Sequence, residues 1–208
     1  MTVRLEPGVL VALEGIDGAG KTTQAALLES RLRALGLEVE RTKEPTDGPW
    51  GRTLRASAST GRLSPDDELH AFLEDRREHV AGLIGPAVAA GKVVLVDRYY
   101  FSTAAYQGAR GRDPEELLRL NEEFAPPPDL LVLLEVVPRV GVARIAARGD
   151  RGNLFEREED LARSAAIFAA LRRPYLLRLD GARPPEALAD EILAAVRRLP
   201  QVARALPA

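Results

Sequence analysis

A glycine-rich turn near the N-terminus has the residue types and the spacing of a phosphate-binding site. Residues 15–22 read Gly-Ile-Asp-Gly-Ala-Gly-Lys-Thr and match G-x-x-x-x-G-K-[ST] at every fixed position. Glycines allow backbone N–H groups to turn inward around phosphate oxygens, and a helix that follows directs its positive end at them. In this arrangement Lys21 reaches the β- and γ-phosphates, and the Thr22 hydroxyl ligates Mg²⁺. The alternative is a glycine-rich strand-to-helix turn that matches the pattern by accident.

The segments on either side of this turn are those that must position it. Apolar residues 9–13 predict a strand before the turn, and Leu28, Leu32 and Leu35 at helical spacing predict a helix over residues 22–35 that ends at Gly36. Residues 92–97 form an apolar run that ends in Asp97, which is typical of a buried parallel strand. Further strands are expected at residues 37–43, 130–136 and 175–179.

Helical patterns alternate with these strands. Helices are expected at residues 51–59, 64–90, 99–108, 113–124, 138–147 and 156–172 and from residue 185 onward, with bends at Gly82 and Gly85 in the second of them. The alternation predicts an α/β fold, in which a five-stranded parallel sheet is covered by helices on both faces. Ligands of such folds bind outside the carboxyl ends of the strands. That rule gathers residues 15–22, 44–48, 97–99 and 148–153 around one cleft.

Composition limits the class of protein. The chain has 208 residues, 46% hydrophobic and 29% charged, which predicts one globular domain over residues 1–208. A net charge of −2 argues against a nucleic-acid partner held by a broad basic surface. With no cysteine and only two histidines, a thiolate or multi-histidine metal centre is not expected. No signal peptide and no run of membrane-spanning length are found, so we expect a cytoplasmic protein without a membrane partner.

An ordered set of motifs resembles the thymidylate kinase family, whose members are dTMP kinases. The motifs are residues 13–24, Lys43-Glu44-Pro45, Phe72 with Arg76, Asp97-Arg98-Tyr99, Ser102, Tyr106-Gln107 and Phe155-Glu156. The resemblance implies the P-loop NTPase fold with a lid loop at about residues 148–157. It also implies ATP and Mg²⁺ as cofactors, a deoxynucleoside monophosphate as acceptor, phosphorylation of dTMP to dTDP, and a homodimer.

The donor side of the site is expected in the phosphate loop. Its residues are Gly15, Ile16, Asp17, Gly18, Ala19, Gly20, Lys21, Thr22 and Thr23. Thr22 and Asp97 are the expected metal residues, since strand-end aspartates in phosphate-loop enzymes order Mg²⁺, here through water. An acceptor phosphate is already ionised, so the site needs positive clamps and alignment more than a general base.

The acceptor side is assigned mainly through the resemblance. Arg98 can hold the acceptor phosphate bidentately, and the alternative for it is a structural ion pair with Asp97. In the family, residues at the positions of Asp17 and Lys43 contact the acceptor's 3′-hydroxyl and phosphate. Asp17 could instead be a turn residue that caps local amides.

Recognition of the base and sugar is assigned to helical residues. Phe72 and Arg76 share one helical face at i and i+4, and in the family the aromatic ring stacks on thymine while the arginine bonds a base carbonyl. Thr103, Tyr106 and Gln107 complete the expected substrate residues. Phe72 and Tyr106 could instead be ordinary packing residues of amphipathic helices.

A catalytic arginine is expected in the lid. Position 18 is glycine, and relatives with that arrangement supply the arginine that stabilises the transferred phosphoryl group from the lid, here Arg148 or Arg151. Arg144 is a third candidate, and the alternative is a solvated basic loop. With Lys21, Asp17 and Arg98, these lid arginines make up the expected catalytic set.

Several positions depart from the family pattern. Lys43 replaces a more usual arginine, residues 73–75 are more acidic than usual, Glu135 stands in a turn that usually carries aspartate, and Phe168 replaces a tyrosine. These departures keep other functions open: another nucleoside monophosphate kinase, a deoxynucleoside kinase, or a nucleotide-binding module without turnover. A regulatory GTPase is disfavoured because the chain has no Asn-Lys-x-Asp motif.

Overall fold

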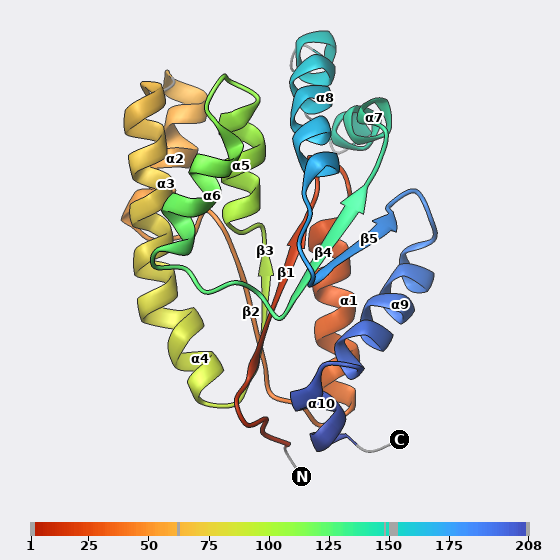
Figure 1. Ribbon diagram of the computed structural model, residues 1–208. Helices are drawn as coiled ribbons and strands as arrows, with labels where there is room; N and C mark the ends of the chain where they lie inside the picture. The colour runs from red at the N-terminus through yellow and green to blue at the C-terminus, as the bar shows by residue number, and fades with distance from the viewer. Residues whose placement is uncertain (1–2, 62, 148, 150–153, 207–208) are drawn as a thin grey trace.

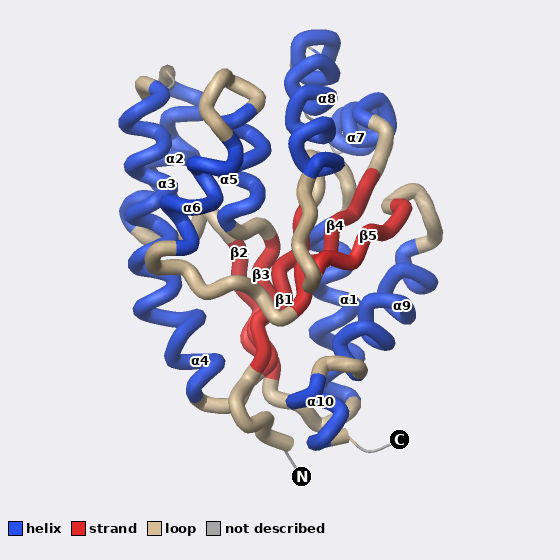
Figure 2. Tube along the Cα trace, in the orientation of Figure 1, coloured by secondary structure: helices blue, strands red, loops and turns tan. Residues whose placement is uncertain are grey.

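The computed structural model describes residues 3–61, 63–147, 149 and 154–206. A parallel sheet of five strands lies at its centre, in the order β2-β3-β1-β4-β5 (Figures 1 and 2). The strands are β1 (Val9–Glu14), β2 (Val39–Lys43), β3 (Val93–Asp97), β4 (Leu130–Glu135) and β5 (Leu176–Asp180). The predicted α/β fold with a five-stranded parallel sheet is therefore confirmed.

Helices connect the strands and cover both faces of the sheet. They are α1 (Lys21–Ala34), α2 (Pro49–Thr60), α3 (Pro65–His79), η1 (Val80–Ile84), α4 (Gly85–Ala89), α5 (Tyr100–Gly108), α6 (Pro114–Glu122), α7 (Pro138–Ala147), α8 (Leu154–Ala170), α9 (Pro185–Arg197) and α10 (Pro200–Ala205). Within the described ranges, none of these helices has the length and apolarity needed to cross a membrane.

Alternate residues of each strand feed two separate cores. On one face, Val9, Val11 and Leu95 pack with α1, α9 and α10 around Leu28 and Ile192. On the other face, the neighbouring strand residues pack with helices from α3 to α8, of which α3, α5 and α6 stand opposite α1 and α9 in Figure 1. Because both of their faces are buried, the inner strands β1, β3 and β4 are apolar up to a final acidic residue, whereas the edge strand β2 is mostly polar and half-exposed.

Two helical features differ from the sequence expectation. The long helix expected over residues 64–90 is interrupted by the π-helical turn η1, in which the N–H of Gly85 bonds to the carbonyl of Val80. A wider turn accommodates Pro86, which cannot donate to the carbonyl of Gly82 and would clash with it in a regular helix. The short helix α10 was not predicted; it begins with Pro200 and buries Val202 against the α9 side of the sheet.

Candidate active site

The phosphate loop joins the carboxyl end of β1 to α1 and is shaped by close backbone packing. Gly18 has a φ of +80°, and a Cβ atom there would lie 2.4 Å from the carbonyl oxygen of Gly141 in α7. Gly20, with a φ of +104°, immediately precedes α1 and leaves its first N–H groups open toward the loop. A side chain at position 18 is therefore disfavoured both by the positive φ and by contact with α7.

Lys21 is the first residue of α1 and folds back over the loop. Its buried ammonium donates hydrogen bonds of 2.9 Å to the carbonyl oxygens of Gly15 and Ile16. Burial, together with the positive charge of Arg98, lowers the pKa of Lys21 to about 7, although nearby carboxylates such as Asp17 oppose the shift. The protein therefore compensates the charge of the ammonium only in part, and an anion in the loop would stabilise it.

Thr22 and Asp97 come together at the edge of the same loop. The Thr22 hydroxyl donates a 2.5 Å hydrogen bond to Oδ2 of Asp97, which ends β3. Hydroxyl and carboxylate oxygens are hard ligands of the kind that Mg²⁺ prefers, and Mg²⁺ in phosphate-transfer sites takes few protein ligands. The pair therefore fits Mg²⁺, with phosphate oxygens and water completing the coordination, and no cluster of three or more metal-ligating side chains occurs among the described residues.

Arg98 lies one residue beyond β3 and is held against the phosphate loop. Its guanidinium forms an ion pair with Asp17 and lies 5.3 Å from the ring centroid of Tyr106. The Tyr106 hydroxyl in turn accepts a 3.0 Å hydrogen bond from the backbone N–H of Asp17. Burial raises the pKa of Tyr106 to about 12, so its phenol stays neutral. The expected alternative partner of Arg98 was Asp97, but its ion pair is with Asp17 across the cleft.

Two cavities meet at this point. The smaller, about 230 Å³, is lined by the phosphate loop with Lys43, Glu44, Asp97 and Arg98. The larger, about 310 Å³, extends between α3 and α5 and is lined by Asp17, Glu44, Pro45, Glu68, Phe72, Arg76, Arg98, Tyr99, Ser102, Thr103, Tyr106, Gln107 and Arg110. Both are lined by Asp17, Glu44 and Arg98. The charged cavity at the phosphate loop thus adjoins a pocket lined by aromatic and polar side chains, and Arg98 lines both.

The larger cavity contains the residues expected to recognise the base and sugar of the acceptor. Phe72 and Tyr106 are half-buried on its wall, while Arg76, Thr103 and Gln107 are almost fully buried. Gln107 donates to Glu68 at 2.8 Å, and its Oε1 atom has no hydrogen-bond partner among the described residues. The substrate residues expected from the sequence therefore line one pocket, and their contacts with a base stay a prediction.

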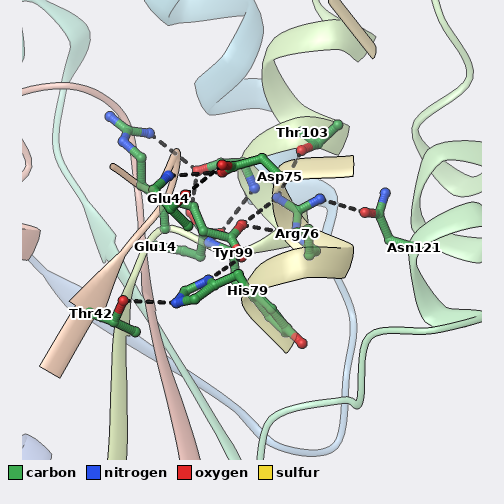
Figure 3. Close-up of polar contacts among 12 residues, drawn as sticks. Glu14, Thr42, Glu44, Asp75, Arg76, His79, Tyr99, Thr103 and Asn121 are labelled. Carbon is green, nitrogen blue, oxygen red and sulfur yellow. Dashed lines mark hydrogen bonds and ion pairs between the residues drawn. The ribbon is translucent and has the colours of Figure 1, made fainter. Parts of the chain in front are cut away.

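Arg76 belongs to a buried polar network that sequence reasoning did not predict (Figure 3). Its Nε and Nη2 atoms donate to Oε2 of Glu44 at 2.8 and 2.5 Å, and further N–H groups bond Asn121 and Thr103. The other carboxylate oxygen of Glu44 bonds His79 Nδ1 at 2.9 Å, and His79 Nε2 lies 2.8 Å from the Thr42 hydroxyl. These contacts fix the plane of the Arg76 guanidinium. The spacing of Arg76 and His79 at i and i+3 was the one local signal of this network.

The residues that depart from the family pattern mostly have structural partners. Asp75 accepts hydrogen bonds from the backbone and hydroxyl of Thr46 at 2.8 and 2.6 Å and so braces the loop after β2. Glu74 pairs with Arg77, Glu135 pairs with Arg178 at 2.6 Å, and the described lining of the larger cavity includes neither acid.

Two other departures lie closer to the cleft. Phe168 packs edge-on against Tyr106, with ring centroids 6.4 Å apart. Lys43 is exposed at the smaller cavity, 3.7 Å from Asp47. Lys43 is therefore the one departure whose own side chain lines the charged cavity at the phosphate loop.

The expected lid arginines, Arg148 and Arg151, lie outside the described residues. Arg144, the third candidate, is described. Its guanidinium donates 3.1 Å hydrogen bonds to the carbonyl oxygens of Gly18 and Gly181, which links α7 to the phosphate loop. Arg144 therefore supports the loop backbone in this structure, and the source of a catalytic arginine stays a prediction.

Comparison with known proteins agrees with this geometry. The family described as Thymidylate kinase matches residues 13–192. The chain is 56% identical to a thymidylate kinase of Xanthomonas campestris pv. campestris (strain B100), over 84% of this chain and 77% of the relative. It is 49% identical to a thymidylate kinase of Xylella fastidiosa (strain M12), over 94% of this chain and 89% of the relative. The chain belongs to the thymidylate kinase family.

Proposed function

We propose that this protein transfers the γ-phosphoryl group of ATP to dTMP, giving ADP and dTDP, with Mg²⁺ as the metal cofactor. The observation that carries the proposal is the meeting of the two cavities at Asp17, Glu44 and Arg98. One cavity has the charge and backbone geometry for a triphosphate, and the other has the aromatic and polar side chains that a nucleoside needs. An acceptor phosphate at their junction would face the transferred group directly.

On the donor side, each residue has a role that follows from its position. Backbone N–H groups of residues 15–23 hold the β- and γ-phosphates at the N-terminus of α1, and Lys21 neutralises the charge that shifts onto the β–γ bridge. Thr22 and Asp97 would hold Mg²⁺, which would supply positive charge to offset the negative charge of the donor phosphates. In-line transfer then depends mainly on alignment and charge rather than on proton removal.

On the acceptor side, charged residues would hold the phosphate, and the shape of the pocket would place the sugar and base. Arg98 and Lys43 would hold the acceptor phosphate, so that one of its oxygens is aimed at the γ-phosphorus. Asp17 exchanges its ion pair with Arg98 for the 3′-hydroxyl of the acceptor sugar. The base lies deeper in the pocket, where it would stack on Phe72.

The base end of the pocket supports a pyrimidine with a carbonyl group. Arg76 is held by Glu44 so that its remaining N–H can donate to a base carbonyl, with Thr103 and Gln107 nearby. Tyr106 would lie against the sugar and leave little room for a 2′-hydroxyl. Arg148 or Arg151 would close over the donor phosphates.

Single-turnover transfer of a labelled γ-phosphate tests this assignment. Enzyme in excess of labelled ATP, with Mg²⁺ and dTMP, should place the label in dTDP. Arg98→Ala should slow that transfer by about 10²–10³-fold, with a much smaller change in ATP affinity, because its main effect is to remove the charge clamp on the acceptor phosphate. Label that appears in inorganic phosphate, or transfer that is as fast to AMP as to dTMP, would contradict the proposal.

Two further properties are proposed on the family resemblance. A homodimer is expected, and light scattering coupled to size-exclusion chromatography should give twice the mass of one chain. A cytoplasmic location fits the ATP and dTMP substrates, and fractionation of cells expressing a tagged chain checks it.

A further inference from the structure

The backbone at Arg98 has an unusual conformation. Among the described residues, Arg98 is the only residue other than glycine with a positive φ, at 69°. An L-residue is disfavoured there, so the surrounding structure must hold the turn in place. The N–H of Arg98 donates to the carbonyl of Leu13 at 3.0 Å, which ties the turn to β1. A second tie comes from the next residue of that strand.

Glu14 ends β1 and buries its carboxylate completely beneath the turn. One oxygen, Oε1, accepts hydrogen bonds from the backbone N–H groups of Tyr99 and Ser102 at 2.8 and 2.9 Å. These N–H groups lie at the start of α5, so the carboxylate caps this helix from a distant part of the chain. Figure 3 shows Glu14 close to Tyr99. Burial raises the pKa of Glu14, while its bonds to Ser102 and Tyr99 and the charge of Arg98 oppose that shift.

The second oxygen of Glu14 reaches Arg98 through one hydroxyl group. Oε2 accepts the hydroxyl proton of Ser102 at 2.6 Å, and the Ser102 oxygen accepts a hydrogen bond from Nη1 of Arg98 at 3.2 Å. A hydroxyl has one proton, so donation to Glu14 turns its lone pairs toward the guanidinium. The opposite edge of the same guanidinium pairs with Asp17.

We propose that Glu14 is a positioning residue, whose carboxylate orients the Ser102 hydroxyl and thereby holds the Arg98 guanidinium at the junction of the two cavities. The inference rests on the proposed role of Arg98 as the clamp on the acceptor phosphate. When the acceptor displaces Asp17 from Arg98, the contact with Ser102 remains and keeps the guanidinium in place. Glu14 itself is buried and touches neither substrate.

The variant Glu14→Gln separates the cap from the orienting function. The amide oxygen can still accept both backbone bonds, but the NH₂ group replaces the oxygen that accepts from Ser102. The Ser102 hydroxyl then lies between two donors, the new amide group and the Arg98 guanidinium. Its own proton has lost the acceptor that fixed the orientation of the hydroxyl. We expect kcat/KM for dTMP to fall about 10- to 100-fold, as small misplacements of aligned groups do, with ATP affinity changed less than about twofold.

Asp129→Asn is the matched control. Asp129 is a partly buried carboxylate that accepts a 2.8 Å bond from the backbone N–H of Leu10 at the other end of β1 and a 3.2 Å bond from Gln201. Its amide variant should lower the melting temperature without a change in kcat/KM for dTMP. An equal loss of kcat/KM in both variants would overturn the proposal, because it would mean that Glu14 acts only by stabilising strand β1.

Ser102→Ala supplies the second test and does not depend on whether Glu14→Gln folds. It should reproduce the loss in kcat/KM, and the double variant should be no slower than Ser102→Ala alone, since both act on one contact. Additive losses, or normal kinetics for Ser102→Ala, would overturn the proposal.

Arg98→Ala distinguishes failure of this inference from failure of the proposed function. If Arg98→Ala leaves acceptor kinetics normal, the clamp assignment itself is wrong. If Arg98→Ala slows transfer and Ser102→Ala does not, only the orienting role of Glu14 fails.

Discussion

The lowered pKa of Lys21 predicts that ATP binding takes up a proton. With a pKa of about 7 in the empty loop, compared with 10.5 ordinarily, Lys21 is mostly neutral at pH 8. The Henderson–Hasselbalch relation makes it about one-tenth protonated there. Triphosphate oxygens beside the ammonium favour its charged form and return its pKa toward the ordinary value of 10.5, so that Lys21 is fully protonated at pH 8 in the complex. Binding of MgATP at pH 8 should therefore take up about 0.9 proton per site.

The sign of the pH dependence follows from the same shift. Between about pH 7 and 10.5 the empty loop holds fewer protons on Lys21 than the ATP-bound loop does. The dissociation constant of MgATP should therefore rise by about tenfold per pH unit above pH 8. Over the same window the unfolded chain also binds more protons than the empty fold, so the contribution of Lys21 to the stability of the empty protein increases with pH.

Titration calorimetry at pH 8 measures this uptake directly. Binding enthalpies in Tris and in HEPES differ by the ionisation enthalpy of the buffer multiplied by the number of protons exchanged. Lys21→Arg is the control, because its guanidinium stays charged at every pH used and should exchange no proton. A wild-type enthalpy independent of buffer, or equal uptake in the arginine variant, would refute the assignment of the titrating group to Lys21.

Three further predictions test other parts of the site. Arg98→Ala should raise the KM for dTMP and lower kcat, and steady-state kinetics that show a change in ATP affinity alone would contradict the clamp role. Gly18→Ala should unfold at a lower denaturant concentration than Gly111→Ala. Both glycines have a positive φ, but only at position 18 would the added Cβ clash with a backbone oxygen, that of Gly141. The φ cost alone is about 1–2 kcal/mol. Thr22→Ala should raise the Mg²⁺ concentration for half-maximal turnover at least about tenfold, whereas Thr22→Ser should not, as a Mg²⁺ titration of activity would show.

The sequence predicted the sheet well because its signals are local. The inner strands β1, β3 and β4 are continuous apolar runs, β2 follows an alternating pattern, and each observed strand lies within about two residues of its expected position. The phosphate loop was found for the same reason, since glycine spacing and Lys21 are read within one short segment. Helix α10 was missed because six residues carry little periodicity, although Pro200 at its first position is a start signal.

The buried parts of the site were not predictable in this way. Glu14 bonds residues 85 and 88 positions away, and Glu44 bonds Arg76 from 32 positions away. No local pattern reports that a carboxylate next to a strand end is buried with a partner from a distant helix. The sequence therefore pointed to Arg76 and Arg98 but not to the acids that fix their orientation. For the same reason, the sequence could not show that Asp75 and Glu135 contact Thr46 and Arg178 instead of lining the acceptor pocket.

Competition between acceptors tests whether dTMP is the preferred substrate. Equimolar dTMP, dUMP, dCMP and AMP are mixed with Mg²⁺, the enzyme and limiting ATP that is labelled in its γ-phosphate, and the labelled diphosphates are separated and counted, so that unlabelled ADP from the donor does not contribute. Their ratio gives the ratio of kcat/KM values in one reaction. We expect dTDP as the main product, with dCDP and the labelled ADP formed from AMP at least about 10²-fold lower, since the wrong base leaves buried polar groups unpaired. A main product other than dTDP would contradict it.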